Sequence, residues 1–515
     1  MLVKTFGSAV YGVEAITITI EVNWMSTGIG IVIVGLPDNA VKESLQRVES
    51  TIKAKGFQMP RTRVVVNMAP ADIKKSGTPF DLPIAIGILA ATEQLQNKEA
   101  LEKYVIMGEL SLDGELRAIK GALPIAIQAR KEGFKGLFVP KVNAKEAGMV
   151  NNLNVYGVEN IQEVIDFFEN EETGLNPVII NTREEFYNSQ GDYEIDFADV
   201  KGQENIKRAL EIAAAGGHNA ILIGPPGAGK TMLAKRLPTI LPPLTLHEAL
   251  ETTKIHSVAG KLPENSTLVT KRPFRSPHHT ISDVALVGGG GNPQPGEISL
   301  AHNGVLFLDE LPEFKRTVLE VMRQPMEERK VTISRAKIAL DFPASFMLVA
   351  SMNPCPCGFF NHPEKECTCP PGAVQKYLNK ISGPLLDRID LHVEVTPVAF
   401  SELSSTKSSE HSSAIRERVI AAREKQAERY KNNPGIYCNA QISSKMLKEI
   451  CVIDTPSQNL LKAAMEKLNL SARAYDRILK VARTIADLSA SENIKAEHLA
   501  EAIQYRSLDR EGWAG

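Results

Sequence analysis

The chain has 515 residues, a formal net charge of −2 and a hydrophobic fraction of 43%. Its length exceeds what one hydrophobic core organises, so we expect two or three domains. The balanced charge excludes a globally basic nucleic-acid binder, and the longest apolar runs, 28–37 and 82–91, are too short to cross a bilayer. Because neither run is long enough to span a bilayer, we expect no membrane partner. Cysteines are scarce outside one loop, which favours a reducing, cytoplasmic compartment.

The first 170 residues alternate β-branched runs with helical patterns. The expected strands are 15–22, 28–35 and 63–70, and the expected helices are 39–56 and 82–95. This pattern predicts a mixed α/β domain over residues 1–172. The polar, acidic segment that follows is predicted to be a linker over residues 173–195.

A second pattern begins near residue 196, where continuous apolar runs alternate with helical stretches. The runs are 219–224, 304–310, 345–353 and 390–395. Continuous apolar strands are typical of a parallel sheet covered on both faces, so an α/β core is predicted over residues 196–398. A Ser-rich stretch at 401–413 indicates a hinge or disordered connection. Residues 399–515 are therefore predicted to be this connection and a helical region.

A phosphate-binding loop is indicated by "GPPGAGKT" between an expected strand and an expected helix. Its residues are Gly224, Pro225, Pro226, Gly227, Ala228, Gly229, Lys230 and Thr231. In this pattern backbone N–H groups surround the phosphates of ATP, Lys230 reaches the β and γ groups, and Thr231 offers a hydroxyl to Mg²⁺.

Two acidic residues end the apolar run "VLFLDE". At the carboxyl end of a buried strand, Asp309 is expected to hold Mg²⁺ and Glu310 to orient the attacking water. Two acids after a strand can also simply begin a helix, but the glycine loop upstream favours catalysis.

Three further polar residues are candidates for the γ-phosphate. Asn353 ends another apolar run and is expected to position the water, unless it is an ordinary strand-end residue. Arg388 is a candidate arginine finger for a neighbouring subunit, the alternative being a local ion pair with an adjacent aspartate, Asp387 or Asp390. Arg473 opens an expected helix and is a candidate sensor of nucleotide state; a solvated helix charge is the alternative, and Arg477 and Arg483 compete for this role.

Two segments are locally basic and are candidate DNA contacts. The first carries Lys271, Arg272, Arg275, His278 and His279, with Phe274 available for base stacking; the second, which reads as a β-hairpin over 328–344, carries Arg329, Lys330, Arg335 and Lys337. A solvated charged face is the alternative for each segment. We do not expect His278 and His279 to share a metal, because neighbouring side chains rarely face the same way.

Four of the six cysteines lie in one loop directly after the run that carries Asn353. They are Cys355, Cys357, Cys367 and Cys369. Two C-x-C pairs in a reducing compartment favour one structural Zn²⁺ held by four thiolates. His362 is an alternative ligand for one position, and free thiols are the other alternative. The loop is expected to hold Asn353 and Arg388 in a fixed relation.

The ordered set of motifs resembles the AAA+ ATPases, a P-loop module with a helical lid. The strings at 271–290, 295–314 and 351–358 resemble more closely the magnesium-chelatase-related branch that includes the ComM and YifB proteins. The resemblance implies a homo-hexamer that binds ATP between subunits. It also implies translocation on single-stranded and branched DNA, with branch migration in homologous recombination and in the integration of DNA during natural transformation, alongside other recombination proteins. The basic hairpin would line the central pore.

Residues 67–91 and 108–140 resemble the proteolytic domain of Lon proteases, a ribosomal-S5-like α+β fold. That family uses a Ser and Lys dyad. Phe80 and Ile125 stand at the matching places, and Ser76 and Lys120 lie nearby but out of register. Without a nucleophile and its base, we expect a platform that does not cleave peptides.

Four functions are therefore compared. The ATP-driven DNA motor is favoured. A magnesium-chelatase motor subunit, which drives metal insertion into porphyrin, is less favoured because the Lon-like front domain and the cysteine loop resemble ComM instead. A Lon-like protease or chaperone is disfavoured by the missing dyad, and a non-catalytic scaffold remains the fourth interpretation.

Overall fold

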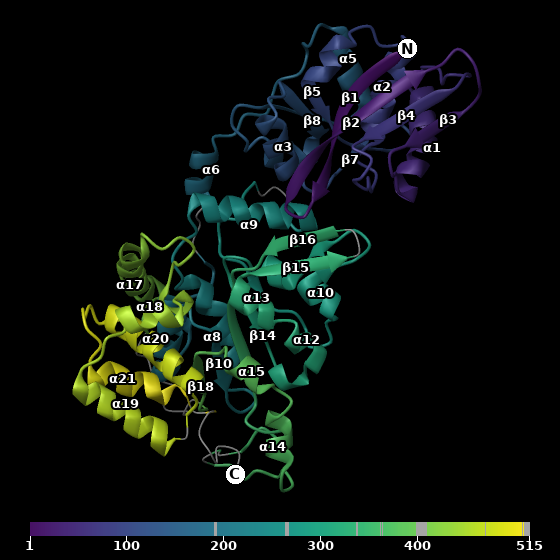
Figure 1. The fold of residues 1–515 in the computed structure, drawn as a ribbon. Helices are drawn as coiled ribbons and strands as arrows, with labels where there is room; N and C mark the ends of the chain where they lie inside the picture. The colour runs from purple at the N-terminus through teal and green to yellow at the C-terminus, as the bar shows by residue number, and fades with distance from the viewer. Residues whose placement is uncertain are drawn as a thin grey trace.

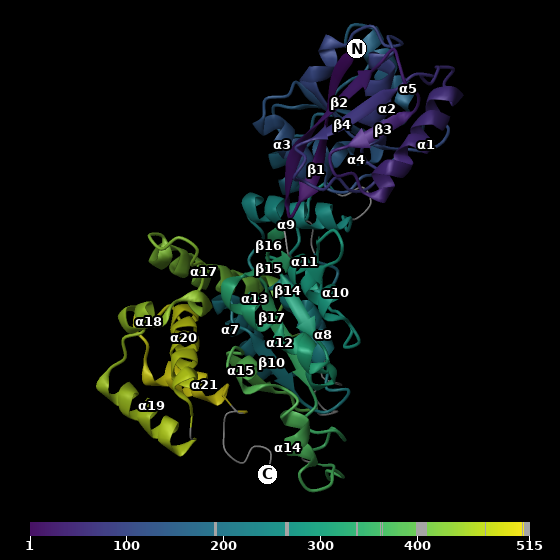
Figure 2. The same ribbon diagram turned by 45° about the vertical axis from the view of Figure 1, so that its right-hand side comes forward.

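The computed structural model of the chain describes residues 1–189, 193–262, 267–335, 338–360, 362, 364–397, 409–468, 470–506 and 508. An N-terminal sheet, a central sheet and a group of C-terminal helices form three successive parts (Figure 1). The C-terminal helices lie beside the central part, and the N-terminal part lies at its other end (Figure 2).

The N-terminal part is built on a seven-stranded sheet with the order β3-β4-β2-β1-β5-β8-β9. Its strands are β1 (Leu2–Tyr11), β2 (Glu14–Trp24), β3 (Ile31–Val34), β4 (Val64–Ala69), β5 (Tyr104–Ile106), β8 (Gly136–Pro140) and β9 (Asn154–Val158). A small hairpin, β6 (Glu109–Leu110) and β7 (Leu116–Arg117), lies outside this sheet. The three strands expected from the sequence are confirmed in β2, β3 and β4.

Five helices accompany this sheet: α1 (Asn39–Ala54), α2 (Asp81–Ala91), α3 (Ala122–Lys131), α4 (Lys141–Ala147) and α5 (Ile161–Glu169). All residues of α2 are buried, as expected for a helix that is apolar all round. Helices α1, α2 and α5 pack in one hydrophobic cluster and α3 and α4 in another. Both helices expected from the sequence, now α1 and α2, are confirmed.

The segment expected to be a plain linker carries a helix, α6 (Thr182–Asn188). The side chain of Asn181 caps it, and Phe186 is buried in the cluster of α3 and α4. Thr182 Oγ1 donates a hydrogen bond to the carbonyl oxygen of Met149 at 2.6 Å. The polar composition of the segment does not indicate this helix, because one aromatic residue, Phe186, supplies most of its packing.

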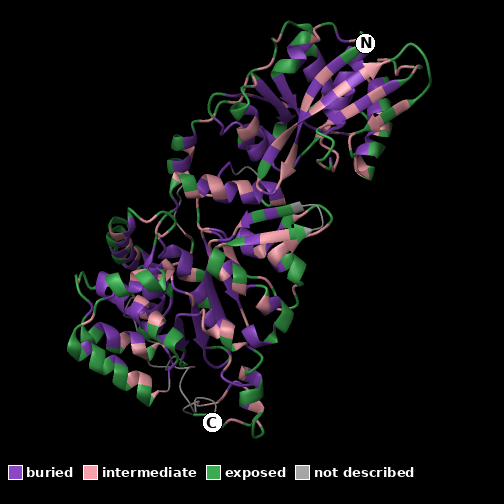
Figure 3. Ribbon diagram, in the orientation of Figure 1, coloured by how far each residue is buried: buried purple, intermediate pink, exposed green. Residues whose placement is uncertain are grey.

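The central part contains a five-stranded sheet with the order β11-β14-β17-β10-β18, and all of its pairings are parallel. Its strands are β10 (Ala220–Ile223), β11 (Phe274–Arg275), β14 (Val305–Leu308), β17 (Met347–Met352) and β18 (Leu391–Glu394). Along β10, Ala220 and Leu222 join one hydrophobic cluster, whereas Ile221 and Ile223 join the other. The predicted parallel sheet, buried on both faces, is confirmed (Figure 3).

The helices of the central part are α7 (Glu204–Gly216), α8 (Lys230–Arg236), α9 (Leu246–Ala259), α10 (Asp283–Val287), α11 (Glu297–Leu300), α12 (Arg316–Glu320), α13 (Arg323–Glu328), α14 (Ala373–Leu378) and α15 (Gly383–Leu386). Two antiparallel pairs stand apart from the central sheet: β12 (Gly288–Gly289) with β13 (Gln294–Pro295), and β15 (Lys330–Arg335) with β16 (Ile338–Pro343). The latter pair confirms the hairpin predicted over 328–344.

The C-terminal part is helical, as expected, and packs against α7 through the same cluster that covers one face of the central sheet. Its helices are α17 (Ser412–Tyr430), α18 (Ser444–Ile450), α19 (Thr455–Lys467), α20 (Ala472–Leu488) and α21 (Ala496–Gln504). The Ser-rich stretch expected to be a hinge lies outside the described residues from 401 to 408. No helix in the described part of the chain has the length and apolarity needed to span a membrane.

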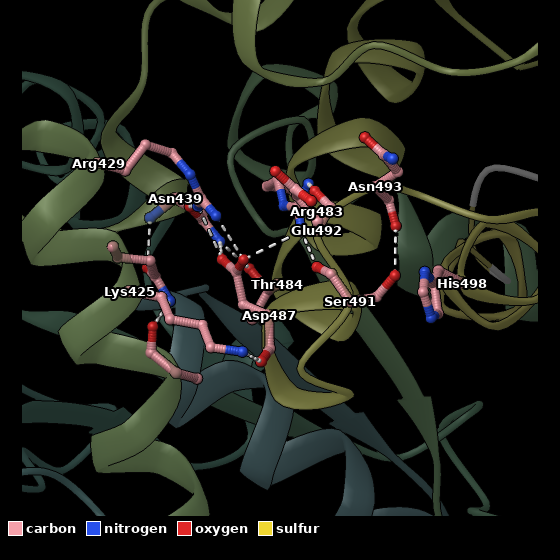
Figure 4. A network of polar contacts seen from close by, with 12 residues as sticks. Lys425, Arg429, Asn439, Arg483, Thr484, Asp487, Ser491, Glu492, Asn493 and His498 are labelled. Carbon is pink, nitrogen blue, oxygen red and sulfur yellow. Dashed lines mark hydrogen bonds and ion pairs between the residues drawn. The ribbon is translucent and has the colours of Figure 1, made fainter.

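An ion pair to a buried carboxylate links α17 to α20 (Figure 4). Arg429 of α17 contacts Asp487 of α20 at 2.6 Å, and Arg483 of α20 contacts the same carboxylate at 3.1 Å. Arg483 also donates to the carbonyl oxygens of Ser491 and Glu492, which holds the loop after α20. Because Arg483 is buried in these contacts, it does not compete with Arg473 as an exposed sensor.

Candidate functional site

The predicted phosphate loop connects the end of β10 to α8. At Gly224 a Cβ atom would lie 2.3 Å from the carbonyl oxygen of Val395, so only glycine fits beside the end of β18. From the other side, Gln203 Nε2 donates a hydrogen bond to the carbonyl oxygen of Ala228 at 2.8 Å. The loop is thus held in place by neighbouring backbone before any nucleotide contact is considered.

Lys230 is buried at the first position of α8 and points back into the loop. Its Nζ lies 2.7 Å from the carbonyl oxygen of Gly224 and 3.2 Å from Oδ1 of Asn353. Burial lowers the pKa of Lys230, although Asp309 and Glu310 act in the opposite direction. The structure therefore brings Lys230 and Asn353, predicted from separate motifs, to one point.

Asp309 follows β14 and faces the phosphate loop. Thr231 Oγ1 donates a hydrogen bond to Asp309 Oδ2 at 2.8 Å, and the Ser351 hydroxyl donates to the other carboxylate oxygen. A hydroxyl and a carboxylate in contact match the oxygen ligands that Mg²⁺ prefers. These two residues fit the predicted metal position.

Glu310 has a left-handed backbone conformation, with φ at 55°, which is uncommon outside glycine and recurs at functional sites. Its side chain is 57% exposed and lines a cavity of about 430 Å³ together with Asn353. The cavity is completed by Glu313, Pro356, Ala373, Lys376, Tyr377 and Lys380. An exposed carboxylate next to a polar cavity is suited to activating a water molecule.

His279 also approaches Glu310, with 3.7 Å between Nδ1 and Oε2. Its ring is 4.1 Å from the ring of His278, centroid to centroid, and packs edge-on against Phe314. The expectation that the two histidines face different ways is therefore wrong. The one group of three or more possible metal ligands among the described residues is the cysteine cluster, and it does not include these histidines.

All four predicted cysteines converge, with sulfur atoms within 4.8 Å of one another. The Sγ–Sγ distances from Cys355 are 3.3 Å to Cys357 and 3.7 Å to Cys367. These are far longer than a disulfide bond of about 2.05 Å. They approach the separation of about 3.8 Å that four sulfurs at roughly 2.3 Å from a tetrahedral Zn²⁺ would have.

The surroundings of the cluster also match a thiolate site. The backbone N–H of Phe360 donates to Cys355 Sγ at 3.3 Å, a contact typical of metal-bound sulfur. His362, the alternative ligand, instead accepts hydrogen bonds at Nδ1 from the backbone N–H groups of Glu364 and Lys365. Among the described residues, the group that could hold a metal ion is therefore the four cysteines.

The cysteine loop lies against the phosphate loop. At Gly358, which has φ at 87°, a Cβ atom would lie 2.6 Å from Cδ of Pro226. Asn353 is thus next to the phosphate loop, as predicted.

Arg388 is not near the phosphate loop. The side chain of Asn219, at the start of β10, donates to the carbonyl oxygen of Arg388, and the phosphate loop follows the other end of that strand. The expectation that the cysteine loop fixes Asn353 and Arg388 together is wrong for Arg388.

Arg388 and Arg473 lie together at this opposite end of the sheet. Arg473 is 70% exposed and forms an ion pair with Asp387, the residue before Arg388. The Arg388 guanidinium pairs with Glu327 of α13, so the local partners considered from the sequence, Asp387 and Asp390, are not its own.

Asp390 is instead engaged in the interior. It is 1% exposed and accepts contacts from Arg477 at 2.8 Å and from His218 at 3.2 Å. Arg477 is thereby committed to this buried pair, which leaves Arg473 as the exposed arginine among the three candidates.

Several predicted DNA contacts in the first basic segment serve the fold. Arg272 donates to the carbonyl oxygens of Pro242 and Asn303 and is largely buried, so it does not fit a phosphate contact. Arg275 forms a bidentate ion pair with Glu297. Phe274 stacks on Phe307 in the core, which removes it as a base-stacking platform.

The remaining basic groups of this segment stay near the surface. Lys271 lies over the Tyr193 ring, with Nζ 5.3 Å from the centroid. His278 is exposed and accepts at Nδ1 from the Thr280 hydroxyl. The segment is therefore a structural connection with a few exposed charges rather than a continuous basic surface.

The hairpin of β15 and β16 presents Lys330, which is 46% exposed and pairs across the strands with Asp341 at 2.9 Å. Arg329 donates to the carbonyl oxygen of Gly435 at 2.7 Å. The side chain of Arg335 and all of Lys337 lie outside the described residues. Of the four basic residues predicted here, Lys330 is the exposed one that the structure describes on the strands.

In the N-terminal part, the two positions matched to the Lon dyad are apolar and buried. Phe80 lies in the cluster with α1 and α2, and Ile125 lies in the cluster with α3 and α4. Lys120 is exposed, with its aliphatic chain next to Gly260. This arrangement offers no nucleophile and base in contact at the two matched positions.

Sequence reasoning missed Ser351 and Gln203, and it named His279 only as a candidate DNA contact and not as a neighbour of Glu310. Ser351 lies inside an apolar strand, and only the pairing of β14 with β17 reveals that its hydroxyl faces Asp309. Gln203 precedes α7 without any motif. The position of His279 in a polar loop after an edge strand is a signal for a functional residue. That its side chain points toward Glu310 depends on packing against Phe314, which the sequence does not reveal.

Comparison with known proteins finds three family models along the chain. The model described as magnesium chelatase, subunit ChlI, matches residues 196–403; the model described as subunit ChlI of Mg-chelatase matches 20–143; and the model described as magnesium chelatase, subunit ChlI C-terminal, matches 409–506. Together these matches include all three parts of the structure.

Curated proteins match over the same extent. The chain is 45% identical to the competence protein ComM of Haemophilus influenzae over 99% of its own length and 98% of that protein. It is 44% identical to the uncharacterized protein YifB of Escherichia coli over 98% and 96% of the two chains. The Lon protease 2 of Bacillus subtilis is 33% identical over 27% of this chain and 26% of its own.

Proposed function

This chain belongs to the magnesium-chelatase-related AAA+ family that includes the ComM and YifB proteins, and from this premise we propose that it is an ATP-driven motor acting on DNA. Family membership supports ATP hydrolysis in general. The finer proposal is a homo-hexameric helicase that migrates branched DNA in homologous recombination and during natural transformation, together with other recombination proteins. The name of the ComM relative supports a role with incoming DNA.

The observation that carries the proposal is the separation of the charged groups along one sheet. Lys230 and Asp309 lie at the carboxyl end of the central strands, whereas Arg388 and Arg473 lie at the amino end. Strand β10 spans about 13 Å between the two ends, more than an arginine side chain reaches. The two arginines therefore cannot serve the phosphate loop of their own chain, and a neighbouring subunit is needed.

Within one chain the phosphate-side residues have distinct proposed roles. The loop residues 224–231 surround the phosphates, and Lys230 releases its backbone contacts to bind the β and γ groups. Thr231 and Asp309 would hold Mg²⁺, whose positive charge would offset the negative charge that develops on the phosphates. Glu310 accepts a proton from the attacking water, and Asn353, which lines the same cavity, orients that water.

From the neighbouring subunit, Arg388 and Arg473 would approach the γ-phosphate. Their present partners, Glu327 and Asp387, are partly exposed carboxylates that a more highly charged phosphate group can replace. An arginine supplied in this way stabilises charge in the transition state of phosphoryl transfer. Hydrolysis would then require assembly into a ring.

We propose a structural Zn²⁺ in the four-cysteine cluster. A tetrahedral thiolate site supplies folding energy and no open coordination position for catalysis. Cys355, Cys357, Cys367 and Cys369 would hold the ion, and Gly358 would then carry the fixed shape of the loop to Pro226. Cytoplasmic location is proposed with it, because thiolates stay reduced there.

Among the described residues, the proposed DNA contacts are reduced to groups near the surface, namely Lys330 and the flanking Arg329 on the hairpin and Lys271 and His278 on the first segment. Arg335 and Lys337 stay as proposals from the sequence, because the side chain of the first and all of the second lie outside the described residues. Such contacts would bind phosphates without sequence preference and weaken as salt rises.

A magnesium-chelatase motor subunit is the second candidate, favoured by the descriptions of the matching family models. The two functions differ in what raises ATP hydrolysis: DNA in the first, and components of porphyrin metallation in the second. A Lon-type protease is disfavoured by Phe80 and Ile125.

The proposal is tested by strand displacement on forked DNA and branch migration on four-way DNA, with ATP and with Glu310→Gln as the control. We expect wild-type protein to convert both substrates and the variant to bind ATP without converting either. A wild-type protein that hydrolyses ATP normally yet converts no DNA would contradict the motor function.

A further inference from the structure

The N-terminal sheet extends into a two-stranded arm. Strand β2 pairs with β4 only from Thr19 onward, and β1 pairs with β5 at Phe6. Beyond these points β1 and β2 continue as a pair with each other alone, from Gly7 opposite Ile18 to Tyr11 opposite Glu14. These five residue pairs extend the ribbon by about 15 Å beyond the sheet.

The tip of the arm rests on the hairpin of β15 and β16. Gly12, at the turn, is buried, and a Cβ atom there would lie 3.6 Å from Cδ2 of Leu340 and 3.7 Å from the carbonyl oxygen of Asp341. Tyr11 and Val13 pack against the cluster that contains Leu340 and Phe342. In both views the arm ends at β16 (Figures 1 and 2).

The arm is also fixed on α9, close to its tip. At Gly121, before α3, a Cβ atom would lie 2.5 Å from Val10 of the arm, and the Gly121 N–H donates to the carbonyl oxygen of Ser257 in α9 at 3.1 Å. Glu14 pairs with Lys254 of the same helix at 3.2 Å. The end of the arm is therefore held by two elements of the central part, α9 and the β15–β16 hairpin.

The hairpin is held by packing and not by a larger sheet. It forms a sheet of two strands only, and an isolated two-stranded hairpin is marginally stable in water. Val331, Leu340 and Phe342 attach it to a hydrophobic cluster of the central part, and Tyr11 and Val13 of the arm add to this packing. The residue beside the tip of the arm, Asp341, holds the exposed Lys330 at 2.9 Å and accepts from the Thr332 hydroxyl at 2.6 Å. The contact at Gly12 thus supports β16, the strand whose residue Asp341 orients the exposed Lys330.

We propose that the β1–β2 arm is a positioning element that holds the β15–β16 hairpin in the orientation needed to grip DNA. This inference rests on the proposed function for its DNA contact, but the mechanical part does not. Tyr11 and Val13 are the positioning residues. The N-terminal part would then act on DNA without touching it, by fixing the direction of Lys330.

The test compares Tyr11→Ala/Val13→Ala with wild-type protein in two measurements. Hydrogen exchange over 330–335 and 338–343 reports the mobility of the hairpin, and we expect it to rise roughly fivefold or more when the tip no longer packs on it. Stimulation of ATP hydrolysis by single-stranded DNA is expected to fall roughly two- to tenfold, while the rate without DNA stays at the wild-type value.

Two controls accompany the variant. Tyr437→Ala/Val452→Ala makes the same chemical changes at side chains that are 69% and 66% exposed, and should alter neither measurement. Tyr11→Phe keeps the packing of the ring and should behave as wild type. Circular dichroism and gel filtration of each variant identify a failure to fold.

The outcomes separate the two claims. If exchange and DNA stimulation both match wild type in a folded Tyr11→Ala/Val13→Ala protein, the arm does not position the hairpin and the inference is wrong. If DNA fails to stimulate even the wild type, the proposed function is wrong, whereas a rise in hairpin exchange would still support the mechanical role. If exchange rises but stimulation is kept, the arm supports the hairpin without serving DNA, and the inference is overturned.

Discussion

At the carboxyl end of the central sheet, polar groups from separate motifs contact one another, whereas at the amino end each candidate arginine is paired with a carboxylate from its own chain. Lys230 contacts Asn353, and Thr231 donates to Asp309, which gives two hydrogen-bonded pairs beside the phosphate loop. Arg388 and Arg473 lie away from this loop, and Glu327 and Asp387 neutralise them.

We propose from this contrast that one chain supplies two halves of a nucleotide site and completes neither. Preassembled donors and acceptors would suit the binding of ATP by a single chain. Arginines that rest on replaceable carboxylates would suit a step that begins only when a neighbour arrives. In the proposed ring a heterologous contact of this kind would repeat, and every phosphate loop would face the arginines of another subunit.

The largest expected effect is at the arginine end. Arg388→Ala should lower kcat for ATP hydrolysis roughly 10³-fold or more, because an arginine supplied in trans stabilises transition-state charge. ATP affinity should stay at the wild-type value, since Arg388 is remote from the phosphate loop of its own chain. Steady-state kinetics and titration with a fluorescent ATP analogue measure the two quantities.

The control for this variant is Arg323→Ala, which removes a half-exposed arginine paired with Glu320 on the same face of the central part. It should retain wild-type turnover. Undiminished hydrolysis by Arg388→Ala, or a loss of ATP binding, would contradict the assignment of catalysis to the arginine end of the sheet and of ATP binding to the phosphate-loop end.

A smaller effect, on the free energy of unfolding, is expected from Asp390→Asn. This change breaks the buried contacts of Asp390 with Arg477 and His218. Burial raises the pKa of Asp390, but Arg477 and His218 lower it more, and the result lies well below the usual range. Removing one partner of a buried pair costs roughly 3–5 kcal/mol of unfolding free energy. Denaturant unfolding at pH 7 measures this difference against wild type.

The pH dependence of this effect has a definite sign. Because the folded-state pKa of Asp390 is depressed, its charge stabilises the fold fully above about pH 4, the ordinary Asp value, and less as pH falls below it. The difference in unfolding free energy between wild type and Asp390→Asn should therefore become smaller as the pH falls below about 4. Asp166→Asn, at an exposed carboxylate on α5, is the control, and an equal loss in both variants would contradict a special role for the buried pair.

A third prediction concerns the cysteine loop at the phosphate end. Purified protein should contain about one Zn²⁺ per chain, and Cys355→Ser/Cys357→Ser should abolish it, because a structural site needs all four ligands. The metal-free loop should lower the melting temperature and raise KM for ATP through the contact between Gly358 and Pro226. Elemental analysis and calorimetry give these values.

The matched control is Cys438→Ser/Cys451→Ser, which alters the two buried thiols outside the cluster and should leave the zinc content unchanged. Wild-type protein that is purified without chelator and contains no zinc would refute the site.

The smallest effect is expected at the hairpin. Lys330→Ala should weaken binding to single-stranded DNA a few-fold and reduce the dependence of log affinity on log salt by about 0.7 for each phosphate that the lysine neutralises. Lys462→Ala, at an exposed lysine on α19, should change neither. Fluorescence anisotropy over a salt series distinguishes the two, and an unchanged salt slope for Lys330→Ala would exclude a phosphate contact.

Features that depend on a few neighbouring residues were predictable from the sequence. The apolar runs gave the strands of the parallel sheet, the glycine loop gave the position of Lys230, and the C-x-C pairs gave the cysteine cluster. In each case the chemistry lies within one short segment, so local pattern and final structure agree.

Features that depend on distant packing were not predictable. Arg272 looks like a surface charge until Pro242 and Asn303 supply carbonyl oxygens to it. Arg388 is separated by 61 residues from Glu327, its partner. The contact of Gly12 with Leu340 joins two parts of the chain that no motif connects. Charge and spacing identify such residues, but only the fold decides what they touch.

The division of the nucleotide site is tested most directly by mixing Lys230→Ala protein with Arg388→Ala protein and measuring ATP hydrolysis after subunit exchange. Each variant alone should be inactive. In a random equal mixture, about a quarter of the interfaces combine an intact phosphate loop with an intact arginine, so we expect recovery of about a quarter of wild-type activity. A mixture that forms rings but stays as inactive as its components would contradict a site shared between subunits.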